Sequence, residues 1–364
     1  MLSWRNKLIL FINYCVSFCL IVGLSAPYIP PSQFVYLSYL ALGIHFFLFT
    51  SIVLMIYWIF NWLKKGILIN IITLLICFSP FSNTFSLRKN LPKHPHTAIK
   101  VLTYNVMNLD LYRWSRGEIV REKIIKLIDS LSADIICLQE FYQGEESAND
   151  NIKIISSSTE NKFHYFHPFV SRPKRGGFFG NVIFSRFPIL KTGAIPFPGK
   201  TSNGGIYADI LLPKHDTVRV YCLHLESFHI PQQDFTNLEH PGNNEKESVK
   251  SAKKIRRKLS TAFIKREAQA KVVKQSLNKC HYPVIVAGDF NDTPYSYAYH
   301  KIRGNLEDAF TTSGKWWSTT VYKPMPLWRI DYLLYSKSIH VFGYETIQKK
   351  LSDHKPVFAW FEMR

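Results

Sequence analysis

The chain has 364 residues, with 45 Lys and Arg against 26 Asp and Glu, which gives a net charge of +19. This length is sufficient for a large catalytic domain together with a second region. The six cysteines show no CxxC motif and no Cys/His spacing, so we expect neither a structural zinc site nor a disulfide framework.

The first 87 residues are apolar, with four basic residues and no Asp or Glu. Three apolar stretches occur there, at Leu8 to Ala26, Phe34 to Trp62 and Gly66 to about Phe81. A helix that crosses a bilayer needs about 20 apolar residues, and the third stretch is the shortest. We expect a membrane region of about three transmembrane helices in residues 1–87. A signal peptide is the alternative for the first stretch, and two spans are the alternative if the third does not cross.

Positive charges orient these spans. Arg5 and Lys7 precede the first stretch, and Lys64 and Lys65 separate the second from the third. Lys and Arg concentrate on the cytoplasmic side of membrane helices. Three spans therefore predict that the rest of the chain lies on the extracytoplasmic, periplasmic side of an inner or plasma membrane. Two spans would place it in the cytoplasm.

After a polar linker at residues 88–98, the chain from 99 to 364 alternates strand-like runs with a few helices. From residue 88 onward it carries 41 Lys and Arg against 26 Asp and Glu, a net +15. Strands that alternate with helices indicate an α/β or α+β domain built on stacked sheets. We expect strands at Ile99–Val106, Ile135–Glu140, Asn181–Ile189, Tyr207–Pro213, Thr217–Leu225, Val284–Ala287, Arg329–Ser336 and Pro356–Met363, with helices at Arg116–Ile135 and about Glu245–Leu277.

Polar residues occur at the ends of six of these strands or within them. Each has an ordinary explanation, since Asn and Asp are common in turns, a lone His is often a satisfied core residue, and Asp331 could pair with Arg329. Chance placement at six strands is a much weaker explanation. Asp289 and Asn291 are two residues apart, so an extended chain would point both to one face. The set comprises Asn105, Glu140, His224, Asp289, Asn291, Asp331, Asp353 and His354.

This set of side chains suits phosphate chemistry. Carboxylate and amide oxygens are the ligands that Mg²⁺ prefers. A carboxylate beside a His fixes the tautomer of the ring and raises its basicity. The sequence has neither a serine nucleophile elbow nor a GxxxxGK[ST] loop, which disfavours a serine hydrolase and a P-loop NTPase.

The motifs that contain these residues appear in the order TYNVMNL, CLQE, LHLES, GDFND, RIDYLLYS and SDHKPV, between about Lys100 and Arg364. In this order they resemble the endonuclease/exonuclease/phosphatase superfamily, of the deoxyribonuclease and sphingomyelinase-like kind. The resemblance implies an α/β fold, a four-layer αββα sandwich of two mixed β-sheets flanked by helices. It also implies hydrolysis of phosphate esters with Mg²⁺ or Mn²⁺.

The resemblance also implies roles for individual residues. Glu140 would bind the metal, with Asn105 beside it and Asp353 close to it. His354 would contact the scissile phosphate and would be oriented by Asp331.

By the same resemblance, Asp289 would activate or position the attacking water, and Asn291 and His224 would hold phosphate oxygens. The resemblance leaves the general base open between Asp289 and the pair of His354 and Asp331.

The substrate stays open at this point. A basic domain suits nucleic acid and also anionic phospholipid headgroups, both of which are phosphodiesters. The alternatives are a phosphomonoesterase of the inositol-phosphate type and a catalytically inactive, membrane-bound scaffold. The basic run Lys250–Arg266 is a solvated helix face, a membrane-surface helix or a helix that tracks a phosphate backbone. Arg175 and Trp328 are weak candidates for substrate contact, and the sequence indicates no protein partner.

Overall fold

The structure is a computed structural model, and it describes residues 2–87, 95–112, 120–172, 177–230, 232–239, 245–322 and 328–364. Packing divides the chain into two compact units. The helical unit consists of Met1–Phe81, Glu226–Ala270 and Tyr295–Lys301. The sandwich unit consists of Ser82–Leu225, Lys271–Pro294 and Ile302–Arg364. The linker predicted at residues 88–98 lies mostly outside the described residues.

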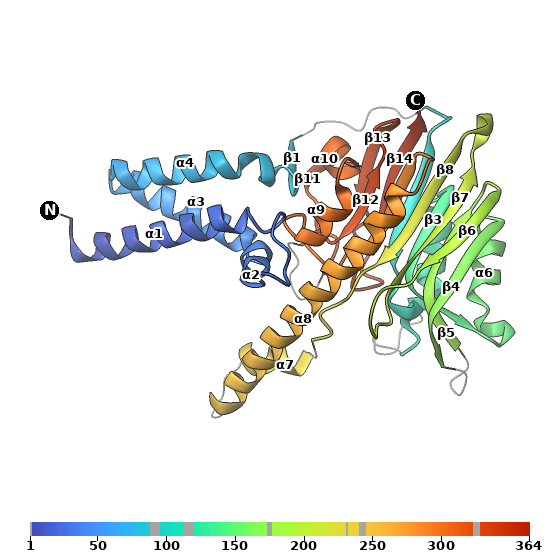
Figure 1. The fold of residues 1–364 in the computed structure, drawn as a ribbon, viewed down its shortest axis with the longest axis horizontal. Helices are drawn as coiled ribbons and strands as arrows, with labels where there is room; N and C mark the ends of the chain where they lie inside the picture. The colour runs from blue at the N-terminus through green and yellow to red at the C-terminus, as the bar shows by residue number, and fades with distance from the viewer. Residues whose placement is uncertain are drawn as a thin grey trace. The chain divides into compact units, whose positions relative to one another are not determined.

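The helical unit is built around three apolar helices that lie side by side (Figure 1). Asn70 of α4 accepts a hydrogen bond from Ser51 of α3 at 2.8 Å and donates one to Asn13 of α1 at 2.8 Å. These buried polar contacts join all three helices. The helices of this unit are α1 (Trp4–Gly23), α2 (Tyr36–Leu42), α3 (Ile44–Phe60), α4 (Lys64–Phe81), α7 (Gln232–Glu239), α8 (Glu245–Asn278) as far as Ala270, and most of α9 (Tyr297–Arg303).

By length and composition, α1 is long and apolar enough to cross a membrane. Helices α2 and α3 pass the same test together as one span bent by 60° at Gly43. Among the described residues, α4 is not a further candidate by that test. Three spans, their orientation and the membrane itself therefore remain predictions.

The sandwich unit contains two six-stranded mixed sheets. The first sheet has the order β13-β14-β2-β3-β5-β4, and the second has the order β10-β12-β9-β8-β7-β6. In the first sheet, β2 and β3 are parallel, and in the second, β8 and β9 are parallel. All other neighbouring strands are antiparallel. A third, two-stranded sheet pairs β1 with β11.

The strands of the first sheet are β2 (Ile99–Asn105), β3 (Ile135–Gly144), β4 (Phe163–Arg172), β5 (Gly177–Ser185), β13 (Ile339–Thr346) and β14 (Val357–Met363). Those of the second are β6 (Ile189–Ile195), β7 (Gly204–Leu211), β8 (Thr217–His224), β9 (Val284–Asp289), β10 (Glu307–Asp308) and β12 (Asp331–Tyr335). The remaining elements are β1 (Phe85–Leu87), β11 (Lys315–Trp317), α5 (Val120–Ser130), α6 (Asn151–Ser158) and α10 (Ala309–Ser313).

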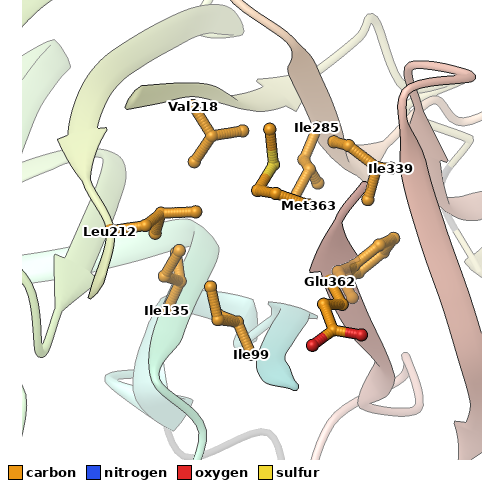
Figure 2. Close-up of a pocket in the computed structure, with 9 residues that line it drawn as sticks. Ile99, Ile135, Leu212, Val218, Ile285, Ile339, Glu362 and Met363 are labelled. Carbon is orange, nitrogen blue, oxygen red and sulfur yellow. The ribbon is translucent and has the colours of Figure 1, made fainter. Parts of the chain in front are cut away.

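The main core lies between the two sheets, where apolar side chains from both faces pack together. A cavity of about 10 Å³ remains there, enough for about one water, and Figure 2 shows Ile99, Ile135, Leu212 and Ile285 around it. The carboxylate of Glu362 points away from this group (Figure 2). A second apolar cluster joins the outer face of the first sheet to α5 and α6. Two mixed sheets with helices outside them confirm the predicted fold class.

The predicted strands and the two predicted helices are present, with end-points shifted by a few residues. Helix α5 begins at Val120, and residues 116–119 of the predicted helix lie outside the described residues. Asp331 is the first residue of β12 rather than an interior one. Strands β4, β6 and β13 were not predicted, because His, Pro, Lys or Gly interrupts their apolar patterns. The short strands β1, β10 and β11 were not predicted either.

Gly288 is a strand glycine whose place the packing demands. Its φ is +149°, and a Cβ there would lie 2.1 Å from the backbone oxygen of Leu223 on β8. The glycine permits β8 and β9 to approach closely, which keeps the last residues of the two strands, His224 and Asp289, in register as a pair.

Candidate active site

The two parallel strand pairs end at the same edge of the sandwich. Asn105 is the last residue of β2, His224 the last of β8 and Asp289 the last of β9. Asp331 pairs with Asp289 across the antiparallel β12–β9 ladder, and His354 lies just before β14. Because parallel strands present their carboxyl ends together, residues from both sheets converge here.

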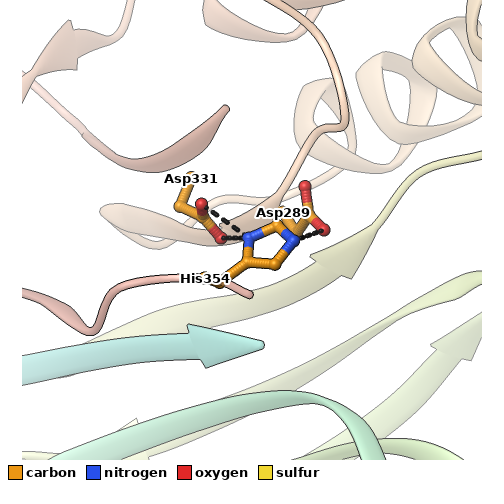
Figure 3. Close-up of side chains that lie close together, drawn as sticks. All are labelled: Asp289, Asp331 and His354. Carbon is orange, nitrogen blue, oxygen red and sulfur yellow. Dashed lines mark hydrogen bonds and ion pairs between the residues drawn. The ribbon is translucent and has the colours of Figure 1, made fainter. Parts of the chain in front are cut away.

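The imidazole of His354 lies between two buried carboxylates, as Figure 3 shows. Its Nδ1 is 2.9 Å from Asp331 Oδ2, and its Nε2 is 3.6 Å from Asp289 Oδ2. Burial alone would lower the pKa of His354, but the charges of Asp331 and Asp289 outweigh burial and raise that pKa well above the ordinary value. The two carboxylates therefore favour the protonated form of the His354 ring.

Asp289 is fully buried, and burial raises the pKa of its carboxyl to about 6. His354 and His224 oppose this rise, and Asp331 adds to it. A carboxylate whose pKa lies near neutrality can accept and return a proton in the physiological range.

Asn105 connects Asp289 to Glu140. Its Nδ2 donates to Glu140 Oε1 at 3.2 Å and to Asp289 Oδ2 at 3.0 Å. Its Oδ1 accepts from the backbone N–H of Met107 at 3.0 Å, which fixes the orientation of the amide. The amide thus joins two carboxylates, Asp289 at the end of β9 and Glu140 within β3.

Glu140 lies at an irregularity of β3, where the register with β5 shifts between Leu138 and Phe141. Its φ of +50° is unusual for a non-glycine residue and re-aims the side chain. The Glu140 side chain is 31% exposed, whereas that of Asp289 is 1% exposed. Glu140 is therefore the carboxylate of this pair that a ligand from solvent can reach.

His224 and Asn291 complete the cluster. His224 Nε2 is 3.5 Å from Glu140 Oε1 and 3.7 Å from Asp289 Oδ2. Asn291 was expected to share a face with Asp289 in an extended chain. The two side chains do meet at 3.2 Å, but through a turn in which Asn291 has a φ of +52° and its N–H donates to Asp289 Oδ1. Its Nδ2 also donates to the carbonyl of Leu225 at 2.9 Å.

The sequence model of the Endonuclease/Exonuclease/phosphatase family matches residues 102–354, which include every residue of this cluster. The chain belongs to the Endonuclease/Exonuclease/phosphatase family. Members of this family are hydrolases of phosphate esters. A second model, of a domain of unknown function (DUF8431), matches residues 6–84.

Relatives of the chain include the uncharacterized protein YbhP of Escherichia coli K12, 25% identical over 282 residues that cover 72% of this chain and 95% of YbhP. Among solved structures, the human Nocturnin catalytic domain with bound sulfate has a TM-score of 0.54 at 20% identity, covering 77% of this chain and 100% of that one. ANGEL2, a 2',3'-cyclic phosphatase, has a TM-score of 0.53 at 15% identity, covering 74% and 97%. These structural likenesses concern the fold alone.

Within this family fold, two supporting residues were not predicted. Ser352 Oγ donates to the backbone carbonyl of Asn105 at 2.8 Å and accepts from the N–H of His354 at 3.2 Å, so it joins β2 to the segment that carries His354. Thr320 Oγ1 accepts from the N–H of Asp331 at 3.1 Å. Ser352 could have been noticed because it directly precedes Asp353 in the SDHKPV motif.

Three predicted site residues lie less clearly in the cluster. Asp353 is exposed, and its Oδ1 is 3.1 Å from Ser352 Oγ. Trp328 is half-buried, and its carbonyl accepts from the N–H of Thr320 at 3.0 Å. Arg175 lies outside the described residues. Their roles stay predictions.

The residues present fit a divalent cation. The carboxylates of Glu140 and Asp289 share one amide donor, the Nδ2 of Asn105, so two anionic oxygen donors lie side by side there. Hard oxygen donors of this kind suit Mg²⁺ or Mn²⁺. Asp289, Asp331 and His354 form a second possible set, with ligand atoms within 4.8 Å of one another. A cation in that second set would have to replace the hydrogen bond between His354 Nδ1 and Asp331.

Proposed function

We propose that the protein is a membrane-anchored, divalent-metal-dependent phosphodiesterase that cleaves its substrate by direct attack of water. The observation that carries this proposal is the imidazole of His354 between Asp331 and Asp289, with Glu140 tied to Asp289 by Asn105. One edge of the sandwich thus offers an acid–base pair and an accessible carboxylate within one cluster.

In this proposal Asp289 is the general base. It is the buried carboxylate whose pKa lies near 6, so it can take the proton of the attacking water at neutral pH. The raised pKa of His354 favours its protonated form, which makes the ring a hydrogen-bond donor rather than a base. Its cationic Nε2–H instead stabilises the charge that develops on the phosphate oxygens, and Asp331 orients the ring from the other side.

Glu140 is the residue that we assign to the metal, because its carboxylate is the accessible one and its position beside Asn105 leaves the His354–Asp331 hydrogen bond intact. When bound, Mg²⁺ or Mn²⁺ would polarise a phosphoryl oxygen and stabilise the leaving oxygen. The ring of His224 and the amide of Asn291 are the donors we assign to phosphate oxygens. Asn291 would take this role by exchanging its hydrogen bond to Asp289 for one to the phosphate.

The substrate in this proposal is a phosphodiester, either nucleic acid or a phospholipid headgroup. The membrane anchor and the extracytoplasmic position of the sandwich unit belong to the proposal, and they rest on the three apolar helices and on the placement of Lys and Arg around them. A reporter fused after Arg364 that is active only outside the cytoplasm supports the orientation. A reporter active only inside contradicts it.

The decisive experiment uses the full chain, since α8 is shared between both units and a fragment that begins after the apolar helices would leave it without its packing partners. Plasmid DNA, sphingomyelin vesicles, glycerophospholipid vesicles and inositol phosphates are assayed with Mg²⁺ or EDTA. We expect metal-dependent cleavage of one diester class that His354→Ala abolishes and that the exposed-residue control His281→Ala preserves.

If only inositol phosphates are cleaved, the protein is a phosphomonoesterase rather than the proposed phosphodiesterase. If no class is cleaved although the protein is folded in the bilayer, a binding or scaffold role takes the place of the enzyme.

A further inference from the structure

Helix α8 is strongly basic, and three acids in or beside it, Glu226, Asp234 and Glu267, are engaged within the helical unit. Asp234 forms an ion pair with Lys254 at 2.9 Å, and Glu226 forms one with Lys265 at 2.6 Å. The carboxylate of buried Glu267 accepts two hydrogen bonds from Ser32, at 2.7 and 2.9 Å. Of the cations in the N-terminal half of the helix, these acids therefore pair only with Lys254 among the described residues.

Four cations in that half remain uncompensated. Lys250, Lys253, Arg256 and Arg257 are exposed. In the part of the chain that the structure describes, their side chains form no ion pair. Four like charges within eight residues repel one another. Binding of an anionic surface there would offset this repulsion and stabilise the helix.

The position of these cations on the helix is informative. Tyr39 of α2 lies 2.6 Å from Ser260 Oγ and donates to the carbonyl of Arg256 at 2.7 Å, and α2 lies beside α8 in Figure 1. Residues 253, 256, 260, 264 and 267 follow one another at three- or four-residue steps, so they share one side of the helix. In the C-terminal part of that side, Ser260 contacts Tyr39 and Glu267 contacts Ser32. The N-terminal part of that side carries Lys253 and Arg256.

The segment that α8 contacts is the connection between two apolar helices rather than their length. Ser32 and Tyr39 lie in and just after the connection from α1 to α2. Large aromatic side chains of this segment, Tyr28, Phe34 and Tyr36, are exposed. Exposed Tyr and Phe next to apolar helices are typical of the level of lipid headgroups, where basic helices also bind.

We propose that the N-terminal half of α8 is a lipid-binding surface that takes the anionic headgroups of the membrane in which the apolar helices are inserted. The surface consists of Lys250, Lys253, Arg256 and Arg257. It includes Arg256 and adjoins Ser260, both of which contact Tyr39 of α2. Headgroups bound there would hold α8 at the bilayer surface, near the exposed aromatic residues that connect α1 to α2. This inference rests on the proposed membrane insertion but not on the proposed chemistry.

The test is lysine footprinting of the full chain in lipid nanodiscs. Acetylation rates of Lys250 and Lys253 are compared between discs of phosphatidylcholine and discs that also contain phosphatidylglycerol. The exposed Lys349 and Lys350 of the sandwich unit are internal controls. We expect at least about fivefold slower acetylation of Lys250 and Lys253 in the anionic discs, because each cation at such a surface changes an equilibrium constant by roughly fivefold. About 0.5 M salt should remove the difference.

A matched pair of variants separates this surface from the overall charge. Arg256→Glu with Arg257→Glu keeps both reporter lysines and should reduce their protection. Lys126→Glu with Lys191→Glu changes the net charge equally on exposed positions of the sandwich unit and should leave the protection intact.

Suppose that the protein resists alkaline extraction but that Lys250 and Lys253 are acetylated at equal rates in the two kinds of disc. This result would contradict the lipid-binding surface and would still support the membrane anchor. Loss of the protein on alkaline extraction would overturn both. Protection by duplex DNA in phosphatidylcholine discs, without protection by anionic lipid, would assign the surface to nucleic acid instead.

Discussion

Arg329 Nη1 lies 2.8 Å from Asp308 Oδ2, and both side chains are fully buried. The guanidinium also lies over the rings of Phe310 and Tyr332 and donates to the carbonyl of Asn83. The sequence left open that Arg329 pairs with Asp331. Since the guanidinium is engaged by Asp308, the carboxylate of Asp331 is directed to His354.

This ion pair leads to a prediction about stability. Arg329→Met leaves Asp308 as a buried charge, and we expect a loss of about 3–5 kcal/mol in the free energy of unfolding of the sandwich unit. The double variant Arg329→Met with Asp308→Leu should recover most of the loss, because no charge is then left unpaired. Denaturant unfolding of the three proteins measures this. A double variant no more stable than Arg329→Met would show that the packing of the guanidinium, rather than its charge, matters.

The proposed roles of His354 and Asp331 predict a graded loss of activity. His354→Ala removes the cation beside the phosphate and should lower kcat by about 10²- to 10⁴-fold. Asp331→Asn keeps the ring but not its carboxylate partner, so it should lower both kcat and the pKa of His354. The imidazole resonance of His354, followed by NMR against pH, reports that pKa. An unchanged pKa in Asp331→Asn would contradict the proposed role of Asp331.

The pKa of Asp289 predicts how stability depends on pH in the absence of metal. Burial raises this pKa from 3.8 to about 6, so the folded state holds the proton more tightly than the unfolded state. Its contribution to stability is thus complete below about pH 4 and is lost as the pH rises through 6. At about 1.4 kcal/mol per pKa unit, the full effect is about 3 kcal/mol.

Asp289→Asn cannot lose a proton, so relative to the wild type it should gain stability between pH 4 and 6. The measurement is the midpoint of thermal unfolding of both proteins in EDTA across this range. A difference between them that does not vary with pH would contradict the raised pKa.

Metal binding gives a prediction that does not depend on turnover. Mg²⁺ or Mn²⁺ should raise the temperature of thermal unfolding, because a ligand that binds only the folded state stabilises it. Glu140→Gln removes the accessible carboxylate and should abolish the shift. Asp129→Asn, at an exposed position on α5, should retain it. A shift that survives in Glu140→Gln but disappears in Asp331→Asn would move the metal to the site of Asp289, Asp331 and His354.

Much of the fold and of the site could be predicted from the sequence, because strand patterns and strand-end polar residues are local signals. Asn105, Glu140, Asp289 and His354 each stand out next to an apolar run. The contacts that join them are not local: Asn105 and Asp289 are 184 residues apart in the chain. The sequence therefore identified the members of the cluster but not which atoms meet.

The features that sequence analysis missed have physical reasons of the same kind. Ser352 acts through its hydroxyl on the backbone of Asn105, a contact that no pattern around Ser352 reveals. The turn at Asn291 depends on a left-handed backbone conformation that Asn adopts only in some contexts. The inclusion of α8 in the helical unit depends on Ser32 and Tyr39, more than 200 residues earlier in the chain.

The close approach of β8 and β9 predicts a large effect of a single methyl group. Gly288→Ala would place a Cβ 2.1 Å from the backbone oxygen of Leu223, so the two strands would have to separate. We expect a loss of about 3 kcal/mol or more, the upper end for overpacking, because the obstacle is backbone rather than a flexible side chain. Activity should fall as well, since the same strands carry His224 and Asp289.

Gly199→Ala is the matched control. Gly199 also has a positive φ, of +80°, but a Cβ there meets nothing within 4 Å. Only the backbone strain of about 1–2 kcal/mol should appear, with activity unchanged. The measurements are the midpoint of thermal unfolding and the kcat of both variants. Equal destabilisation by the two would mean that backbone conformation alone, and not the contact with β8, requires glycine at position 288.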